Sequence, residues 1–132
     1  MKIDQSQMNR LVATAEPDFQ ARVLAYLRER QAPFVEGLSD DELKRRVRFS
    51  LAVGRAHGFT AEAALVSFTN LMFNVGPDFW KQPAFARALK IQLPNEMDRI
   101  NAVLANVTDE DWSVAQMAAD ENAWPITDEF AA

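Results

Sequence analysis

The stretch from residue 61 to residue 74 constrains the fold more than any other, because it carries a single charge, Glu62. At helical spacing, Leu65 and Phe68 fall on one broad apolar face, while Phe73 falls on the far side. A helix that is apolar nearly all round is buried by neighbours on more than one side. We therefore expect residues 61–74 to form a central helix with other helices packed around it.

Caps and prolines divide the rest of the sequence into further helices. Pro17 suits the first turn of a helix that ends before Pro33, and Ser39 begins the clearest one, because Ser39 and Glu42 fit a capping box. The expected helices cover about residues 4–13, 17–32, 40–57, 61–74, 83–93, 96–107 and 109–118. No run alternates apolar and polar residues over the length of a strand. The expected fold class is all-α, a single compact helical bundle of six to seven helices.

The turns between these helices carry their own signals. Gly58 is placed to end the helix at 40–57 in the left-handed conformation, and Thr60 is placed to cap the central helix. Asn95 and Thr108 are the expected N-caps of two later helices. His57, beside Gly58, is expected to be structural, since a cation there would favour the negative end of the helix dipole.

A chain of 132 residues is long enough for one domain with a core of ordinary size. We assign residues 1–119 to the helical bundle and residues 120–132 to an acidic C-terminal tail. Pro125 lies inside the tail, which favours an extended or mobile segment over a helix.

Most classes of catalytic chemistry lack their residues in this sequence. There is no cysteine and there is one histidine, which excludes disulfides, thiolate nucleophiles and multi-histidine metal sites. Acidic runs at 40–42 and 109–111 begin helices, where the dipole accounts for them. No phosphate-binding glycine loop and no hydrolase or metalloprotease motif occurs. We therefore expect a protein that is not an enzyme and that uses no metal or other cofactor.

Charge is unevenly distributed, and this bears on partners. Residues 1–91 carry a balance of about +3 and residues 92–132 about −8, for a net charge of −5. An acidic protein repels phosphate backbones, so no nucleic-acid partner is expected. The N-terminus lacks the apolar segment of a signal peptide, and the weakly charged stretch 63–77 is too short to span a bilayer. We expect a cytoplasmic protein with no membrane partner.

A basic stripe on the helix at 40–57 is the one concentration of positive charge. Lys44, Arg48 and Arg55 fall within about 40° of one another on a helical wheel, and Arg45 and Arg46 flank them. The stripe is either a solvated face or a docking surface, for an acidic partner or for the chain's own acidic tail. DNA binding is disfavoured, because the following helix offers no charged recognition face.

Large aromatic residues stand at two positions outside the expected helices. Phe79 and Trp80 follow a Gly-Pro turn, where they either close the core or contact a partner. Trp124 lies in the acidic tail, where it either clamps the tail to its own domain or is presented to another protein.

The central part of the sequence resembles a family of small proteins encoded in bacterial type VI secretion clusters, beside effectors, spike tips and effector-loading adaptors. The resemblance covers about residues 45–100 and rests on several features: the basic helix ending in Arg55-Ala-x-Gly58, Thr60-x-Glu62, the run 71–73, Gly76, Phe79, Pro83 and residues 97–99. It implies an accessory role in loading or stabilising an effector, as a co-chaperone beside a dedicated adaptor. His57, in place of a bulky residue, and the tail from Asp120 depart from the family pattern.

Our leading hypothesis is a protein-binding accessory, an adaptor or co-chaperone whose partner is an effector or its loading adaptor. The expected contact residues lie on the basic helix, at the Gly-Pro turn and in the tail: Lys44, Arg45, Arg48, Arg55, Phe79, Trp80 and Trp124. The alternative is an immunity or inhibitor protein that blocks a toxin with its acidic, aromatic tail. The sequence leaves the oligomeric state open.

Overall fold

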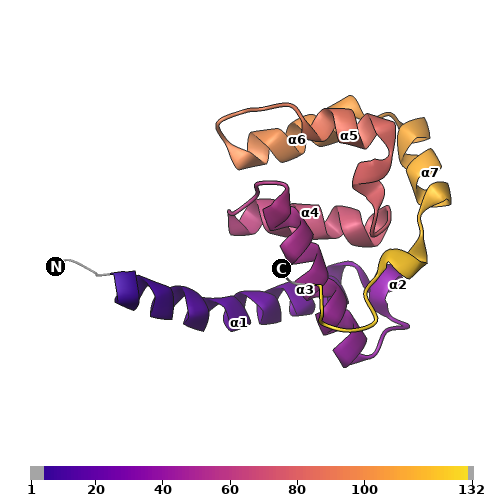
Figure 1. The fold of residues 1–132 in the computed structure, drawn as a ribbon. Helices are drawn as coiled ribbons and strands as arrows, with labels where there is room; N and C mark the ends of the chain where they lie inside the picture. The colour runs from indigo at the N-terminus through magenta and orange to yellow at the C-terminus, as the bar shows by residue number, and fades with distance from the viewer. Residues whose placement is uncertain (1–4, 131–132) are drawn as a thin grey trace. The chain divides into compact units, whose positions relative to one another are not determined.

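The computed structural model describes the backbone of residues 5–130 and the side chains of residues 16–130. Within this part of the chain the secondary structure is entirely helical, which confirms the predicted all-α fold class. Figure 1 shows the elements along the chain. The α-helices are α1 (Gln5–Arg30), α2 (Ala32–Val35), α3 (Asp40–Ala56), α4 (Glu62–Asn74), α5 (Pro83–Leu89), α6 (Glu96–Asn106) and α7 (Asp109–Ala118), and the 3-10 helices are η1 (Phe79–Lys81) and η2 (Glu121–Ala123).

The chain divides into two compact units, the first ending at Lys44 and the second beginning at Arg45. Helix α3 therefore begins in the first unit and continues in the second. The boundary that the sequence suggested after residue 119 falls inside the second unit, because the tail residues pack against the helices of that unit.

The first unit is built on α1, which runs without interruption through Pro17. The sequence had suggested two helices there, at residues 4–13 and from residue 17 onward, and this expectation is wrong for the residues that the structure describes. Proline removes one backbone donor from a helix, whereas starting a second helix would require a new and costly nucleus. The expected end before Pro33 is confirmed, since α1 stops at Arg30 and Pro33 lies in the first turn of α2.

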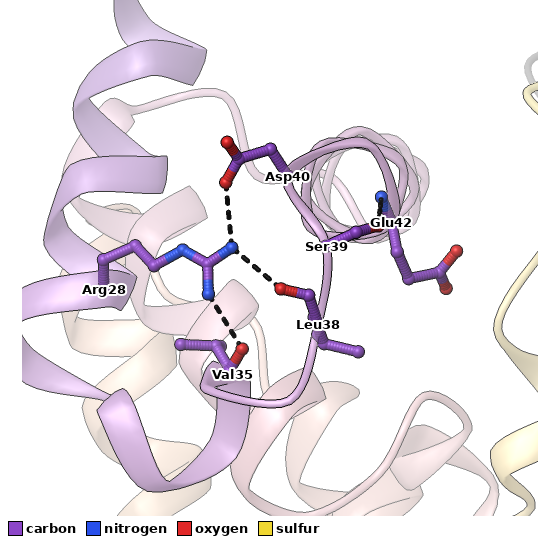
Figure 2. Close-up of polar contacts among 6 residues, drawn as sticks. All are labelled: Arg28, Val35, Leu38, Ser39, Asp40 and Glu42. Carbon is purple, nitrogen blue, oxygen red and sulfur yellow. Dashed lines mark hydrogen bonds and ion pairs between the residues drawn. The ribbon is translucent and has the colours of Figure 1, made fainter.

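A single arginine ties the end of α1 to the loop that leads into α3. The guanidinium group of Arg28 donates to the carbonyl oxygens of Val35, at 2.9 Å, and Leu38, at 3.0 Å, and it pairs with the Asp40 carboxylate at 3.0 Å. Figure 2 shows the guanidinium group reaching all three acceptors. The Ser39 hydroxyl oxygen accepts from the backbone N–H of Glu42 at 3.2 Å, so Ser39 caps α3 as predicted.

In the second unit, α3 turns into α4 through a glycine corner. Gly58 has a φ of +91°, as expected for a residue that ends a helix in the left-handed region. Thr60 does not cap α4 with its side chain. Instead the Glu96 carboxylate, from the start of α6, accepts from the backbone N–H groups of Thr60 and Ala61 and from the Thr60 hydroxyl group. The cap of α4 is therefore supplied by a residue 36 positions away.

Helix α4 is buried as its composition predicts. Its fully or nearly fully buried residues include those on both faces of the helix: Ala64, Leu65, Phe68, Thr69, Leu71, Met72 and Phe73. Helix α6 packs against both α4 and α5, and Figure 1 shows α5 and α6 side by side. The expectation that α4 is packed on more than one side is confirmed.

The remaining helix boundaries follow their caps. The side chains of Asn95 and Thr108 accept from backbone N–H groups of α6 and α7, as predicted, and Thr108 forms a full capping box with Asp111. Helix α5 is shorter than expected: it ends at Leu89, and Leu93 is exposed. Because the helix ends at Leu89, with Lys90 as its C-cap, Leu93 lies outside the helix and is not part of its buried face.

The end of α7 returns to the end of α4, and this return directs the tail. The Gln116 side-chain amide donates to the carbonyl oxygen of Asn74 at 2.8 Å. A Cβ atom on Gly76 would lie 2.5 Å from the Cβ of Ala119, so only glycine permits this approach. The backbone N–H of Asp120 then donates to the Asp78 carboxylate at 3.3 Å. The chain therefore enters the tail from a defined position.

Candidate functional site

Residues 120–130, which we call the docked tail, lie against the part of α3 that belongs to the second unit. Trp124 is 5% exposed, and its ring centroid lies 5.1 Å from that of Phe73 and 6.0 Å from that of Phe49. The Arg46 guanidinium group lies over the same ring, 4.8 Å from its centroid. Phe130 packs edge-on against Phe49, with centroids 5.4 Å apart. We call Phe49, Phe73, Trp124 and Phe130 the tail cluster.

Two arginines of α3 hold acidic residues of the tail on either side of Trp124. Two N–H groups of Arg48 donate to one oxygen of Asp128, at 2.7 and 3.1 Å. Arg46 pairs with Glu121 at 4.0 Å. Both carboxylates remain more than half exposed, so these pairs set the position of the tail more than its binding free energy.

The tail also has local structure. Asp120 caps η2, because its carboxylate accepts from the backbone N–H of Asn122 at 2.9 Å. The backbone N–H of Ala123 donates to the carbonyl oxygen of Asp120 within the same turn. A short 3-10 helix, η2, precedes Trp124, while residues 124–130 form bends and turns and no helix. The expectation that the tail is not helical therefore holds beyond Ala123. In this structure Trp124 clamps the tail to its own unit.

Phe79 and Trp80 belong to a second group of rings, which we call the inner cluster. Phe79 is 2% exposed, and its ring lies 5.1 Å from that of Phe68 and 5.4 Å from that of Phe85. Trp80 is half-buried and packs edge-on against His57, with centroids 5.7 Å apart. Phe79 therefore closes the core, while Trp80 reaches the surface at the end of α3. The inner cluster comprises His57, Phe59, Phe68, Phe79, Trp80, Phe85 and Trp112.

His57 is held in a setting that disfavours its charged form. Burial and the nearby Arg99 guanidinium group lower the pKa of His57 below its usual value. Arg99 donates to the His57 carbonyl oxygen at 3.2 Å and lies over the Phe59 ring, 4.4 Å from its centroid. These contacts agree with the structural role expected for His57. They do not favour a protonated imidazole at the end of the helix, because burial and Arg99 both lower the pKa of His57. Arg99, from α6, places a cation at the His57 carbonyl oxygen, in addition to Arg55 in the last turn of α3.

The other candidate residues lie at the surface. Lys44 is exposed at the end of the first unit, Arg45 is half-buried, and Arg55 is exposed in the last turn of α3. Of the seven residues proposed from sequence, Arg48 and Trp124 are brought to one surface by the docked tail. Phe79 and Trp80 join the inner cluster instead.

One pocket in the described part of the chain can be characterised by its lining residues. A shallow groove of about 250 Å³ lies between η1 and α7, lined by Asp78, Phe79, Lys81, Gln82, Pro83, Val114, Ala115 and Ala118. This volume is below that of typical small-molecule sites. The residues with described side chains contain no group of three or more potential metal ligands, and no helix among them is long and apolar enough to cross a membrane.

Sequence reasoning missed four residues of this surface. Phe49 and Phe73 were assigned to helices without a role at the surface, and Glu121 and Asp128 were counted only as tail charge. The charge asymmetry could have pointed to Glu121 and Asp128, because an acidic tail in a chain with one basic helix has an intramolecular partner of opposite charge. No signal in the sequence points to Phe49 and Phe73 as the neighbours of Trp124.

Comparisons with known proteins identify no relative of this chain: no family model, no curated protein and no solved structure matches it. The resemblance over residues 45–100 therefore stands on the sequence features given above.

Proposed function

We propose that this protein is a non-catalytic protein-binding accessory, and that the basic and aromatic surface of α3 is its binding surface. The observation that carries the proposal is the docked tail. Arg46, Arg48 and Phe49 hold an acidic segment of the same chain through one buried tryptophan and flanking carboxylates. Aromatic anchors with charged neighbours are the usual means by which protein surfaces recognise one another.

The cellular setting that we propose is type VI secretion, with an effector or its loading adaptor as the partner. The support for this setting is the resemblance over residues 45–100. A cytoplasmic accessory that loads effectors needs a binding surface and no catalysis, which is in keeping with the residues available here. Trp80, half-buried beside His57 at the end of α3, is a second proposed contact residue for the partner.

Co-purification with the effector and adaptor encoded beside the gene tests this function. Arg45→Glu and Trp80→Ala are expected to reduce recovery of the partner at least about fivefold, because one reverses a charge and the other removes an aromatic anchor. Lys90→Glu is the matched control, since Lys90 is exposed at the end of α5 and carries the same charge. Unchanged recovery with both variants, with native circular dichroism, would contradict the proposal.

The alternative, an immunity protein that blocks a toxin with its tail, requires the tail to be presented outward. Trp124 is buried against Phe49 and Phe73, which leaves Ile126 as the large apolar residue that the tail exposes. The test is protection of cells from a toxin encoded beside the gene. The alternative is favoured if Ile126→Asp abolishes this protection while Arg45→Glu retains it. Loss on Arg45→Glu alone would favour the accessory role.

A further inference from the structure

We propose that the docked tail is an exchangeable occupant of the α3 surface, and that the partner presents a segment of the same chemistry: a tryptophan with a carboxylate on each side. This inference rests on the proposed function, because it names the kind of segment that the proposed binding surface accepts. It also implies that the unbound protein covers its own binding surface. Three features of the tail contact support it.

The first feature is the chemistry of the tryptophan site. The ring of Trp124 lies between Phe49 of α3 and Phe73 of α4, under the Arg46 guanidinium group. Two aromatic walls and a cation above the ring favour an electron-rich aromatic side chain over an aliphatic one. Indole is the best cation–π partner among natural side chains. The site therefore selects tryptophan.

The second feature is the spacing of the acids. Glu121, three residues before Trp124, pairs with Arg46, and Asp128, four residues after it, pairs with Arg48. The segment that fits this surface is therefore an acid, two residues, tryptophan, three residues and a second acid. Between the tryptophan and the second acid, Ile126 is 87% exposed, so the surface does not select a particular side chain at that position of the partner segment.

The third feature is the way in which the tail is held. The backbone N–H groups of Ala123 and Trp124 donate to carbonyl oxygens of Asp120 and Glu121, within the tail itself. The hold on α3 comes from side chains: the buried Trp124, the half-buried Phe130 against Phe49, and two ion pairs whose carboxylates are 72% and 59% exposed. Because a single anchor carries most of such a contact, a segment with an equivalent anchor can take its place.

Competition with the tail has a measurable consequence. A tethered segment has a high effective concentration, so the tail covers the surface in most molecules. The apparent affinity for a competing segment is then its intrinsic affinity multiplied by the fraction of molecules in which the surface is uncovered. A variant in which the tail cannot dock is expected to bind the competitor more tightly, although the tail itself makes no contact with the competitor.

The experiment uses the full chain and a blocked synthetic peptide with the sequence of residues 120–130, DENAWPITDEF. Binding is measured by calorimetry to the natural chain and to Trp124→Ala. We expect the peptide to bind Trp124→Ala at least about tenfold more tightly than the natural chain. Asp128→Arg in the full chain weakens the tail by its charge alone and is expected to tighten peptide binding in the same direction. It provides the test if Trp124→Ala does not fold.

Matched peptides and a charge exchange establish which contacts are used. The peptide with alanine in place of its tryptophan is expected not to bind, whereas alanine in place of its isoleucine is expected to leave affinity unchanged. In the Trp124→Ala chain, Arg48→Glu is expected to weaken binding of the natural peptide. A peptide with Asp128→Arg, the change at the second of its two paired acids, is expected to restore binding to that double variant.

Three results would overturn the inference. Equal affinity for the natural chain and both tail variants would show that the tail does not compete. Absence of binding to a folded Trp124→Ala chain would show that the surface does not accept a separate segment. A natural chain that forms a dimer, and that becomes monomeric on Trp124→Ala, would assign the surface to a second copy. Each result leaves the co-purification test with Arg45→Glu and Trp80→Ala unaffected, so the two proposals fail separately.

Discussion

The two aromatic clusters of the second unit differ in how the chain builds them. The inner cluster is assembled mostly from residues between His57 and Phe85, which follow one another through α4, η1 and α5. The tail cluster joins α3 and α4 to the docked tail, and the Arg48–Asp128 pair beside it spans 80 positions. The inner cluster centres on buried phenylalanines, whereas the tail cluster is bordered by arginine–carboxylate pairs.

This difference bears on how much each cluster contributes to the stability of the folded state. Burial of neutral rings within a continuous stretch supports the folded state as a whole. A cluster closed by a terminal segment can open without unfolding the helices beneath it, because the tail is held at its entry by the Gly76 approach and on α3 by Trp124. The expected effects of mutation therefore fall in a definite order.

The largest effect is expected from Phe79→Ala, in the inner cluster. Phe79 is 2% exposed and contacts the rings of Phe68 and Phe85, so truncation leaves a cavity that costs about 3–5 kcal/mol of unfolding free energy. Urea denaturation followed by circular dichroism measures the loss. Leu104→Ala, at an exposed position of α6, is the control and is expected to cost less than about 0.5 kcal/mol.

An intermediate effect is expected from Trp124→Ala, which releases the tail. The lost burial of one large aromatic ring is worth about 2 kcal/mol, offset in part by the freedom that the tail regains. Hydrogen exchange is expected to become faster at the backbone amides of residues 123 and 124, whereas the amides of α4 keep their protection. Ile126→Ala, in the same tail and exposed, serves as the control and is expected to change neither quantity. A larger loss than that of Phe79→Ala would reverse the comparison.

The smallest effect is expected from pH, through His57 at the edge of the inner cluster. Burial, followed by the charge of Arg99, lowers the pKa of His57 in the folded state, so the unfolded chain binds its proton more readily. The stability that comes from the neutral imidazole is present above the unfolded pKa of about 6.5 and is lost as pH falls from there through the folded pKa. In the natural chain, the unfolding free energy is expected to decrease as the pH is lowered across this window. The His57→Phe variant is expected to show a smaller dependence of the unfolding free energy on pH. An unchanged slope would remove His57 as its cause.

Two helix caps show what local sequence can and cannot reveal. Thr108 caps α7 in a capping box, in which the Asp111 carboxylate, three residues on, accepts from the backbone N–H of Thr108. Hydrogen bonds from the backbone N–H and the hydroxyl group of Thr108 lower the pKa of Asp111. Glu96 caps α4 from 36 residues away, and the backbone N–H groups of Thr60 and Ala61 lower the pKa of Glu96. The first cap was readable in the sequence as Thr108 followed by acids. The second was not, because nothing in the residues around Thr60 indicates that an acid of α6 lies beside them.

The same distinction holds for the candidate site. The basic stripe of α3 was identified from helical spacing, and Trp124 was identified as an anchor for the tail or for a partner. Its neighbours Phe49 and Phe73 were not assigned to the surface, because their roles depend on where the tail returns. That return depends on the close approach of Gly76 and Ala119, which no local pattern encodes.

The sequence by itself determined the all-helical class, the buried character of α4 and the caps at Ser39, Asn95 and Thr108, because each follows from interactions within a turn or two of helix. Only the tertiary structure decided that α1 continues through Pro17, that Glu96 caps α4 and that Trp124 lies on α3. These outcomes depend on contacts between residues far apart along the chain or on the balance between continuing and restarting a helix. Neither is visible in a short window of sequence.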